Sequence, residues 1–151
     1  MAEPRSVAFA DLESLAGQDI GASDWHVIDQ DRVNMFADAT GDHQWIHVDI
    51  ERATREIGGP IVHGFLTLSL VPWLGAEVLK VTGVTRGINY GSDKVRFTNM
   101  VPVGSKVRLT QKCLSINEKA GGKQMVVENV IEIEGQDRPA LVAEAITILY
   151  G

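Results

Sequence analysis

The sequence FLTLSLVPWLGAEVL, at residues 65–79, decides the fold because hardly any polar side chain interrupts it. Its apolar residues would lie on every side of a helix, and a helix that is apolar all round must be enclosed on most sides. At fifteen residues, with Pro72 inside it, the segment is too short to span a membrane comfortably. We therefore expect a central helix over residues 65–79 with a sheet wrapped around it.

The flanking sequence supplies the other elements. Asp29 and Asp49 are typical N-caps of two amphipathic helices, and Gly41 and Gly58 are placed to end them. Alternating or continuous apolar residues predict extended segments at residues 86–99, 105–117, 125–134 and 140–149. Helices followed by antiparallel strands predict one α+β domain that covers residues 1–151.

Composition excludes several classes of protein. The formal net charge of −6 argues against broad binding of nucleic acid or of an anionic membrane. The single cysteine, Cys113, rules out an internal disulfide and favours a reducing compartment. The N-terminal residues have mixed charge and no apolar run after them, so a secretory signal is not expected. We expect a cytoplasmic protein.

Asp42 and His47 are the strongest candidates for catalytic residues. On a continuous helix, five positions correspond to about 500°, which would leave the two side chains about 140° apart. They can meet only where the backbone is irregular, and Gly41 provides such a point. A carboxylate next to an imidazole can act as a general acid/base pair. Alternatively, Asp42 is an ordinary turn residue that bonds to the local backbone.

His63 and Gly64 open the apolar segment. The first N–H groups of a helix are unpaired and partly positive, so an acyl oxygen could dock at Gly64. His63 is either a capping or core residue or a residue that lines the site. His43 and His47 have the spacing of zinc ligands on a helix, but Gln44 stands where the metalloprotease motif needs Glu. We therefore expect no metal site.

Lys94 and Arg96 alternate with apolar residues in a strand-like stretch. They form either a solvated strand face or a contact for the phosphates of an acyl carrier.

The sequence resembles the MaoC-like dehydratases, which include the R-specific enoyl-CoA hydratases, or hydratase 2. The similarity covers roughly residues 24–150, and its most specific elements are FADATGD at 36–42, His47, and IVHGFL at 61–66. One departure is Gln44-Trp45, where the family usually has Asn-Pro. In this respect the chain resembles nodulation protein N-like members.

The resemblance implies a hot-dog fold, a curved antiparallel sheet around a central helix, assembled as a homodimer. It also implies Asp42 and His47 as catalytic residues and the backbone N–H of Gly64 as the oxyanion hole. Gln44, His63, Lys94 and Arg96 are expected to bind substrate. The expected reaction is reversible hydration of a trans-2-enoyl-CoA or acyl-carrier-protein thioester to the (R)-3-hydroxyacyl thioester, without a cofactor. A hot-dog thioesterase and a non-catalytic acyl-thioester-binding module are the alternatives.

Overall fold

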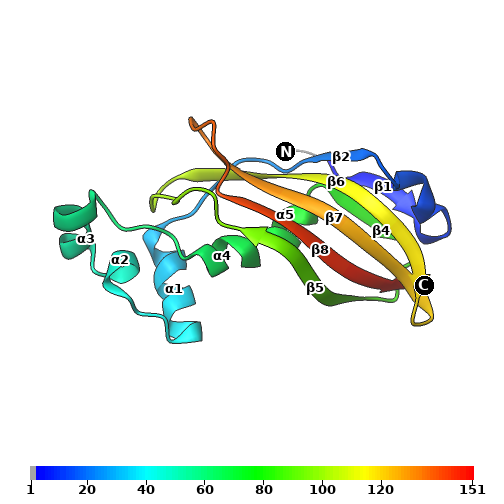
Figure 1. Ribbon diagram of the computed structural model, residues 1–151, viewed down its shortest axis with the longest axis horizontal. Coiled ribbons are helices and arrows are strands. Elements are labelled where there is room, and N and C mark those ends of the chain that lie inside the picture. Colours follow the sequence, from blue (N-terminus) through cyan, green and yellow to red (C-terminus); the bar gives the residue numbers. More distant parts are fainter. Residues whose placement is uncertain (1–2) are drawn as a thin grey trace.

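A curved, mainly antiparallel sheet forms the largest part of the computed structural model, which describes residues 3–151 (Figure 1). Its strands are β2 (Asp19–Ala22), β3 (His26–Val27), β5 (Arg86–Arg96), β6 (Lys106–Lys119), β7 (Gly122–Ile133) and β8 (Leu141–Tyr150). The strand order is β2-β6-β7-β8-β5, and β3 also pairs with β6. β8 therefore lies inside the sheet, as its apolar sequence predicts, and β5 lies at an edge.

The concave face of the sheet carries the core. Val107 and Leu109 on β6 stand opposite Ile133 and Ile131 on β7, and all four are buried. Polar residues alternate with them on the convex face. This period of two, visible in the sequence, is what places the apolar side chains on one face.

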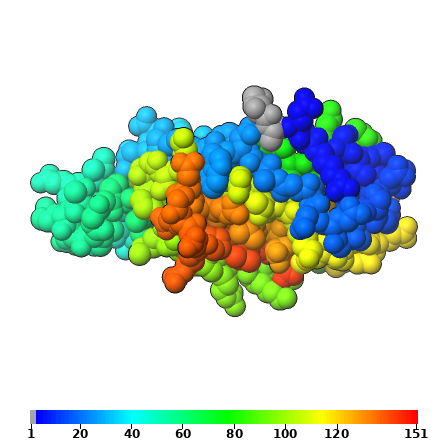
Figure 2. Space-filling model, turned by 90° about the horizontal axis from the view of Figure 1, so that it is seen from above, coloured from blue at the N-terminus to red at the C-terminus, as the bar shows by residue number. Residues whose placement is uncertain are grey.

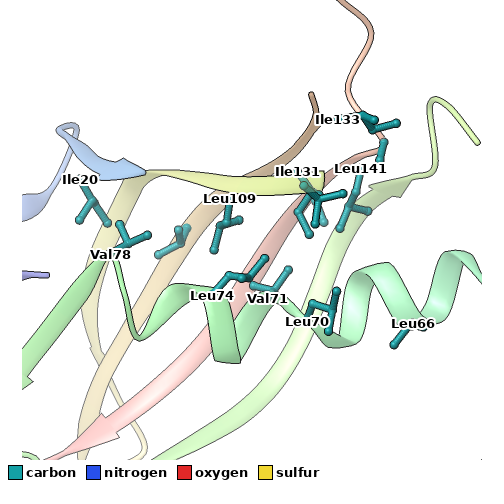
Figure 3. Packing of buried hydrophobic residues seen from close by; sticks show 14 of the residues in the cluster. Ile20, Leu66, Leu70, Val71, Leu74, Val78, Leu109, Ile131, Ile133 and Leu141 are labelled. Atoms are coloured by element: carbon teal, nitrogen blue, oxygen red, sulfur yellow. The ribbon is translucent and has the colours of Figure 1, made fainter. Parts of the chain in front are cut away.

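The predicted central helix is present but shorter than residues 65–79. It consists of α4 (Gly64–Ser69) and α5 (Val71–Gly75), and Leu70 and Leu74 point from it toward the sheet (Figure 3). Pro72 lies in the first turn of α5, where a missing N–H is tolerated. The prediction was wrong beyond Gly75.

Leu79 begins a strand in place of the predicted helix end. This strand, β4 (Leu79–Thr82), pairs in parallel with β1 (Arg5–Ala8) as a separate two-stranded sheet. An apolar run does not by itself distinguish a buried helix from a strand.

Within the chain the sheet encloses the central helix on one side. Phe65 and Trp73 keep 68% and 39% of their surface exposed. The expected enclosure on most sides is therefore incomplete in a single copy.

Short helices and the strands β1 to β3 make up the first part of the chain. The helices are η1 (Phe9–Leu15), α1 (Gln30–Thr40), α2 (Trp45–Val48) and α3 (Ile50–Ile57). The predicted caps are confirmed, because Asp29 accepts from the backbone N–H of Arg32 and Asp49 from that of Arg52. α1, α2 and α3 lie together at one end of the molecule, beyond the sheet (Figures 1 and 2). Among the described residues, no helix has the length and apolar character needed to cross a membrane.

Candidate active site

Asp42 and His47 meet through a turn, as the sequence predicts. Gly41 ends α1 in the left-handed conformation at φ +83°, and the Asp42 carboxylate then accepts from the backbone N–H of Gln44 at 3.3 Å. The chain reverses before α2 begins. As a result, ligand-type atoms of Asp42, His47 and His63 all lie within 4.8 Å of one another. The geometry needed for a carboxylate–imidazole pair is present.

A backbone carbonyl fixes the orientation of the His47 ring. The side chain is buried, and its Nδ1 lies 2.6 Å from the carbonyl oxygen of Ile61. Since a carbonyl can only accept, Nδ1 is the ring nitrogen that donates. In the neutral ring, Nε2 therefore keeps its lone pair and can accept a proton.

His63 contacts both members of this pair. Its ring stacks on that of His47, with centroids 3.8 Å apart, and also contacts Phe36. Its Nε2 donates to the backbone carbonyl of Asp42 at 3.0 Å. The side chain is 2% exposed, and its Nδ1 is buried with no hydrogen-bond partner among the described residues. His63 thus connects the Asp42 turn to the start of α4.

Burial lowers the pKa of His63, although its bond to Asp42 opposes the shift. A proton is then taken up more readily by the unfolded chain, so the free energy of unfolding should decrease as the pH falls below about 6.5. We expect this loss to be smaller in His63→Gln than in the wild-type protein. Urea unfolding at pH values on either side of 6.5 measures it, and equal losses in both proteins would contradict the assignment.

A cavity of about 410 Å³ opens beside this cluster. His47, Gly64, Thr67, Phe97 and Arg138 are among the residues that line it. Gly64 is the first residue of α4, so its N–H has no partner within the helix. A Cβ atom at this position would lie 3.1 Å from the Phe97 ring, so a side chain here would crowd that ring.

Some expected substrate-binding residues lie elsewhere. Lys94 pairs with Glu144 at 3.2 Å, and the Arg96 guanidinium donates to the carbonyl of Val95; neither lines this cavity. His63 lies behind His47 and does not line the cavity either. Their contact with substrate stays a prediction.

Arg138 lines the cavity, and sequence reasoning missed it. It follows the predicted turn at 135–137, and no motif connects this loop with residues 42–64.

Gln44 and Trp45 keep the backbone that an Asn-Pro pair would require. Gln44 has φ −58° and ψ 140°, which is the conformation favoured before proline. Trp45 begins α2, the position at which proline is favoured in a helix. Its ring lies under the guanidinium of Arg52 at 4.1 Å. The exposed Gln44 side chain makes no cap bond to α2, and its contact with substrate stays a prediction.

The arrangement favours proton transfer over metal binding. His43 pairs with Asp38 at 2.9 Å, and this bond raises its pKa. His47 and His63 are stacked at an interplanar angle of 22°, so their lone pairs lie in two nearly parallel planes. Two such lone pairs do not converge on one ion about 2 Å from each nitrogen.

Comparisons with known proteins show what this chain is similar to. The family described as "MaoC like domain" matches residues 11–135. The 3-hydroxyacyl-thioester dehydratase Z of Mycobacterium tuberculosis is 51% identical over 139 residues, covering 91% of this chain and 92% of that protein. Nodulation protein N of Rhizobium leguminosarum bv. viciae is 45% identical over 148 residues, covering 95% of this chain and 91% of that protein.

A solved structure shows the same fold. The (R)-hydratase from A. caviae involved in PHA biosynthesis superposes with a TM-score of 0.73 at 25% identity, covering 89% of this chain and 96% of that chain. The α+β hot-dog architecture expected from the sequence is therefore confirmed.

Proposed function

The chain belongs to the MaoC-like dehydratase family, and we propose that it catalyses reversible hydration of a trans-2-enoyl thioester to an (R)-3-hydroxyacyl thioester. The observation that carries this proposal is the placement of Asp42 next to His47, beside a cavity that Gly64 also lines. The likeness to the A. caviae (R)-hydratase supports the R configuration in this proposal.

In the hydration direction, a water molecule bonds to Cβ of the enoyl group and a proton is added to Cα. The Asp42 carboxylate and Nε2 of His47 can each accept a hydrogen bond from this water. One of them takes the proton as the C–O bond forms, and the pair then delivers a proton to Cα. The reverse sequence dehydrates the hydroxyacyl thioester.

Negative charge develops on the thioester oxygen before Cα is protonated. A preorganised backbone N–H at that oxygen stabilises such a charge, and Gly64, which lines the cavity at the start of α4, is our candidate for it. Water and the thioester supply every atom of the reaction, so we propose that no cofactor takes part.

The carrier of the acyl group is CoA or acyl-carrier protein, both of which bear phosphate. Arg138, exposed where it lines the cavity, is suited to contact such a group. The acyl chain itself would follow the apolar space between the central helix and the sheet, where a second cavity of about 600 Å³ lies.

Turnover of crotonyl-CoA tests the proposal against its alternatives. A hydratase consumes the enoyl absorbance without releasing thiol, whereas a thioesterase releases free CoA. Binding of several acyl-CoAs without either reaction would identify a binding module. We expect loss of absorbance with no thiol.

We also propose that the protein is a homodimer joined along β5. This strand lies at the edge of the sheet, where backbone groups are free to pair with another strand, and Ile88 and Tyr90 on it are 45% and 56% exposed. Where such a strand pair crosses its two-fold axis, equivalent residues of the two copies come close together.

Sedimentation should therefore show a species of twice the 16.4 kDa chain mass. Replacing Ile88 and Tyr90 together by Lys should shift it to the monomer through like-charge repulsion. Val27→Lys, at an exposed position on β3 and away from β5, serves as the control. A wild-type monomer at micromolar concentration would contradict the proposal.

A further inference from the structure

We propose that the cavity under α5 selects acyl chains with a hydroxyl or keto oxygen near their far end, which the Gln111 side chain binds. This inference rests on the proposed function, because it concerns the tail of the same thioester substrate.

One stripe of the central helix lines both cavities. The cavity beside His47 is lined by Gly64 and Thr67, and the second cavity by Leu68, Val71 and Gly75. These positions follow the i, i+3, i+4, i+7 and i+11 spacing of a single helix face. We infer that a chain anchored at Gly64 follows this face into the second cavity, which Ser69, Pro72 and Ala76 of the same helix also line.

Two facing amides are among the polar side chains that line that second cavity. Gln111 on β6 stands opposite Asn129 on β7, and its Nε2 donates to Asn129 Oδ1 at 2.7 Å. Their neighbours along the same face include Leu109 and Ile131, which are fully buried. Buried amides are costly unless they are hydrogen-bonded, so such a pair in an acyl cavity calls for an explanation.

Asn129 engages both polar atoms of its amide within the protein. It is 1% exposed, accepts from Gln111, and donates through Nδ2 to the carbonyl of Val127 at 3.1 Å. In Gln111 only Nε2 is bonded within the protein. Within residues 3–151 its Oε1 accepts no hydrogen bond, and its Nε2 has a second hydrogen to donate. A hydroxyl can satisfy both groups, and a keto oxygen can accept from Nε2.

Gly75 leaves room for this amide. A Cβ atom at Gly75 would lie 3.4 Å from Nε2 of Gln111, so a larger side chain would occupy the space beside it. The absence of a side chain keeps the amide of Gln111 open to the cavity that both residues line.

The distance from Gly64 to Gly75 along the helix indicates how long the acyl chain must be. From Gly64 to Gly75 a helix rises about 16 Å at 1.5 Å per residue. An extended chain covers roughly 1.2 Å per bond, so the oxygen would lie about thirteen bonds from the thioester carbonyl.

The test compares a trans-2-enoyl-CoA of about fourteen carbons with its terminally hydroxylated counterpart. With the wild-type enzyme we expect kcat/KM to favour the hydroxylated chain by about tenfold, the effect of one net hydrogen bond. In the double variant Gln111→Met/Asn129→Leu, this preference should disappear. Both amides are replaced together because replacing Gln111 alone would leave Oδ1 of the buried Asn129 without its donor.

Thr110→Leu is the matched control. Thr110 precedes Gln111 on β6 and lies outside the second cavity. This variant should keep the wild-type preference.

The absence of a preference in the wild-type enzyme would overturn the inference, and this result does not depend on folding of the variant. It would also be overturned if the double variant kept the preference, with or without a change in Tm, because the amides would then be purely structural. Turnover of crotonyl-CoA, which is too short to reach Gln111, tests the proposed function separately.

Discussion

Asp42→Asn and His47→Gln are each expected to lower kcat/KM with crotonyl-CoA by at least about 10²-fold, the usual contribution of a general acid or base. Asp42→Asn keeps the shape of the turn but removes the acceptor charge. His47→Gln keeps a donor for the carbonyl of Ile61 but removes the titratable ring nitrogen. Since Asp42 is exposed, its replacement should alter Tm little.

Asp38→Asn is the control for this prediction. Asp38 is a nearby exposed carboxylate that bonds to His43 and lies outside the cluster. Its replacement should leave the rate unchanged. Because residues that act as a unit are not additive, the double variant of Asp42 and His47 should lose little more than either single variant. A near-wild-type rate in either single variant would remove that residue from the mechanism.

Gly64→Pro should also lower the rate strongly. Proline has no backbone N–H, so the variant loses the proposed donor to the negative charge on the thioester oxygen. Proline is well tolerated at the first position of a helix, and His63, at φ −58° and ψ 137°, already has the conformation favoured before proline. We expect kcat to fall by about 10²–10³-fold, the range for loss of one oxyanion-hole donor.

The added ring would crowd Phe97, so this substitution is best made in a Phe97→Ala background. Gly64→Ala in the same background retains the N–H and is the matched control. If the alanine and proline variants turn over at the same rate, the Gly64 N–H does not stabilise the developing charge.

Local chemistry made much of this site predictable. Asp29, Gly41 and Asp49 begin or end helices through bonds to residues only a few positions away in the sequence. The helix boundaries could therefore be predicted from the sequence. Because Gly41 ends α1, Asp42 and His47 could be expected to converge, and they do. The alternating apolar residues of β6 and β7 similarly determined the concave face.

Long-range contacts could not be predicted in the same way. The stacking of His63 on His47 depends on how the start of α4 meets the turn after α1. Arg138 comes to the cavity from a loop between β7 and β8. The pairing of β1 with β4 joins residues more than seventy positions apart, and their sequences contain no signal for a partner.

The most direct test of the proposed reaction is dehydration of (R)- and (S)-3-hydroxybutyryl-CoA, which is monitored by the appearance of the enoyl absorbance. We predict rapid formation of crotonyl-CoA from the R substrate alone, and its loss in Asp42→Asn. Equal use of both enantiomers, or an undiminished rate in Asp42→Asn, would contradict the proposed reaction at the Asp42–His47 pair.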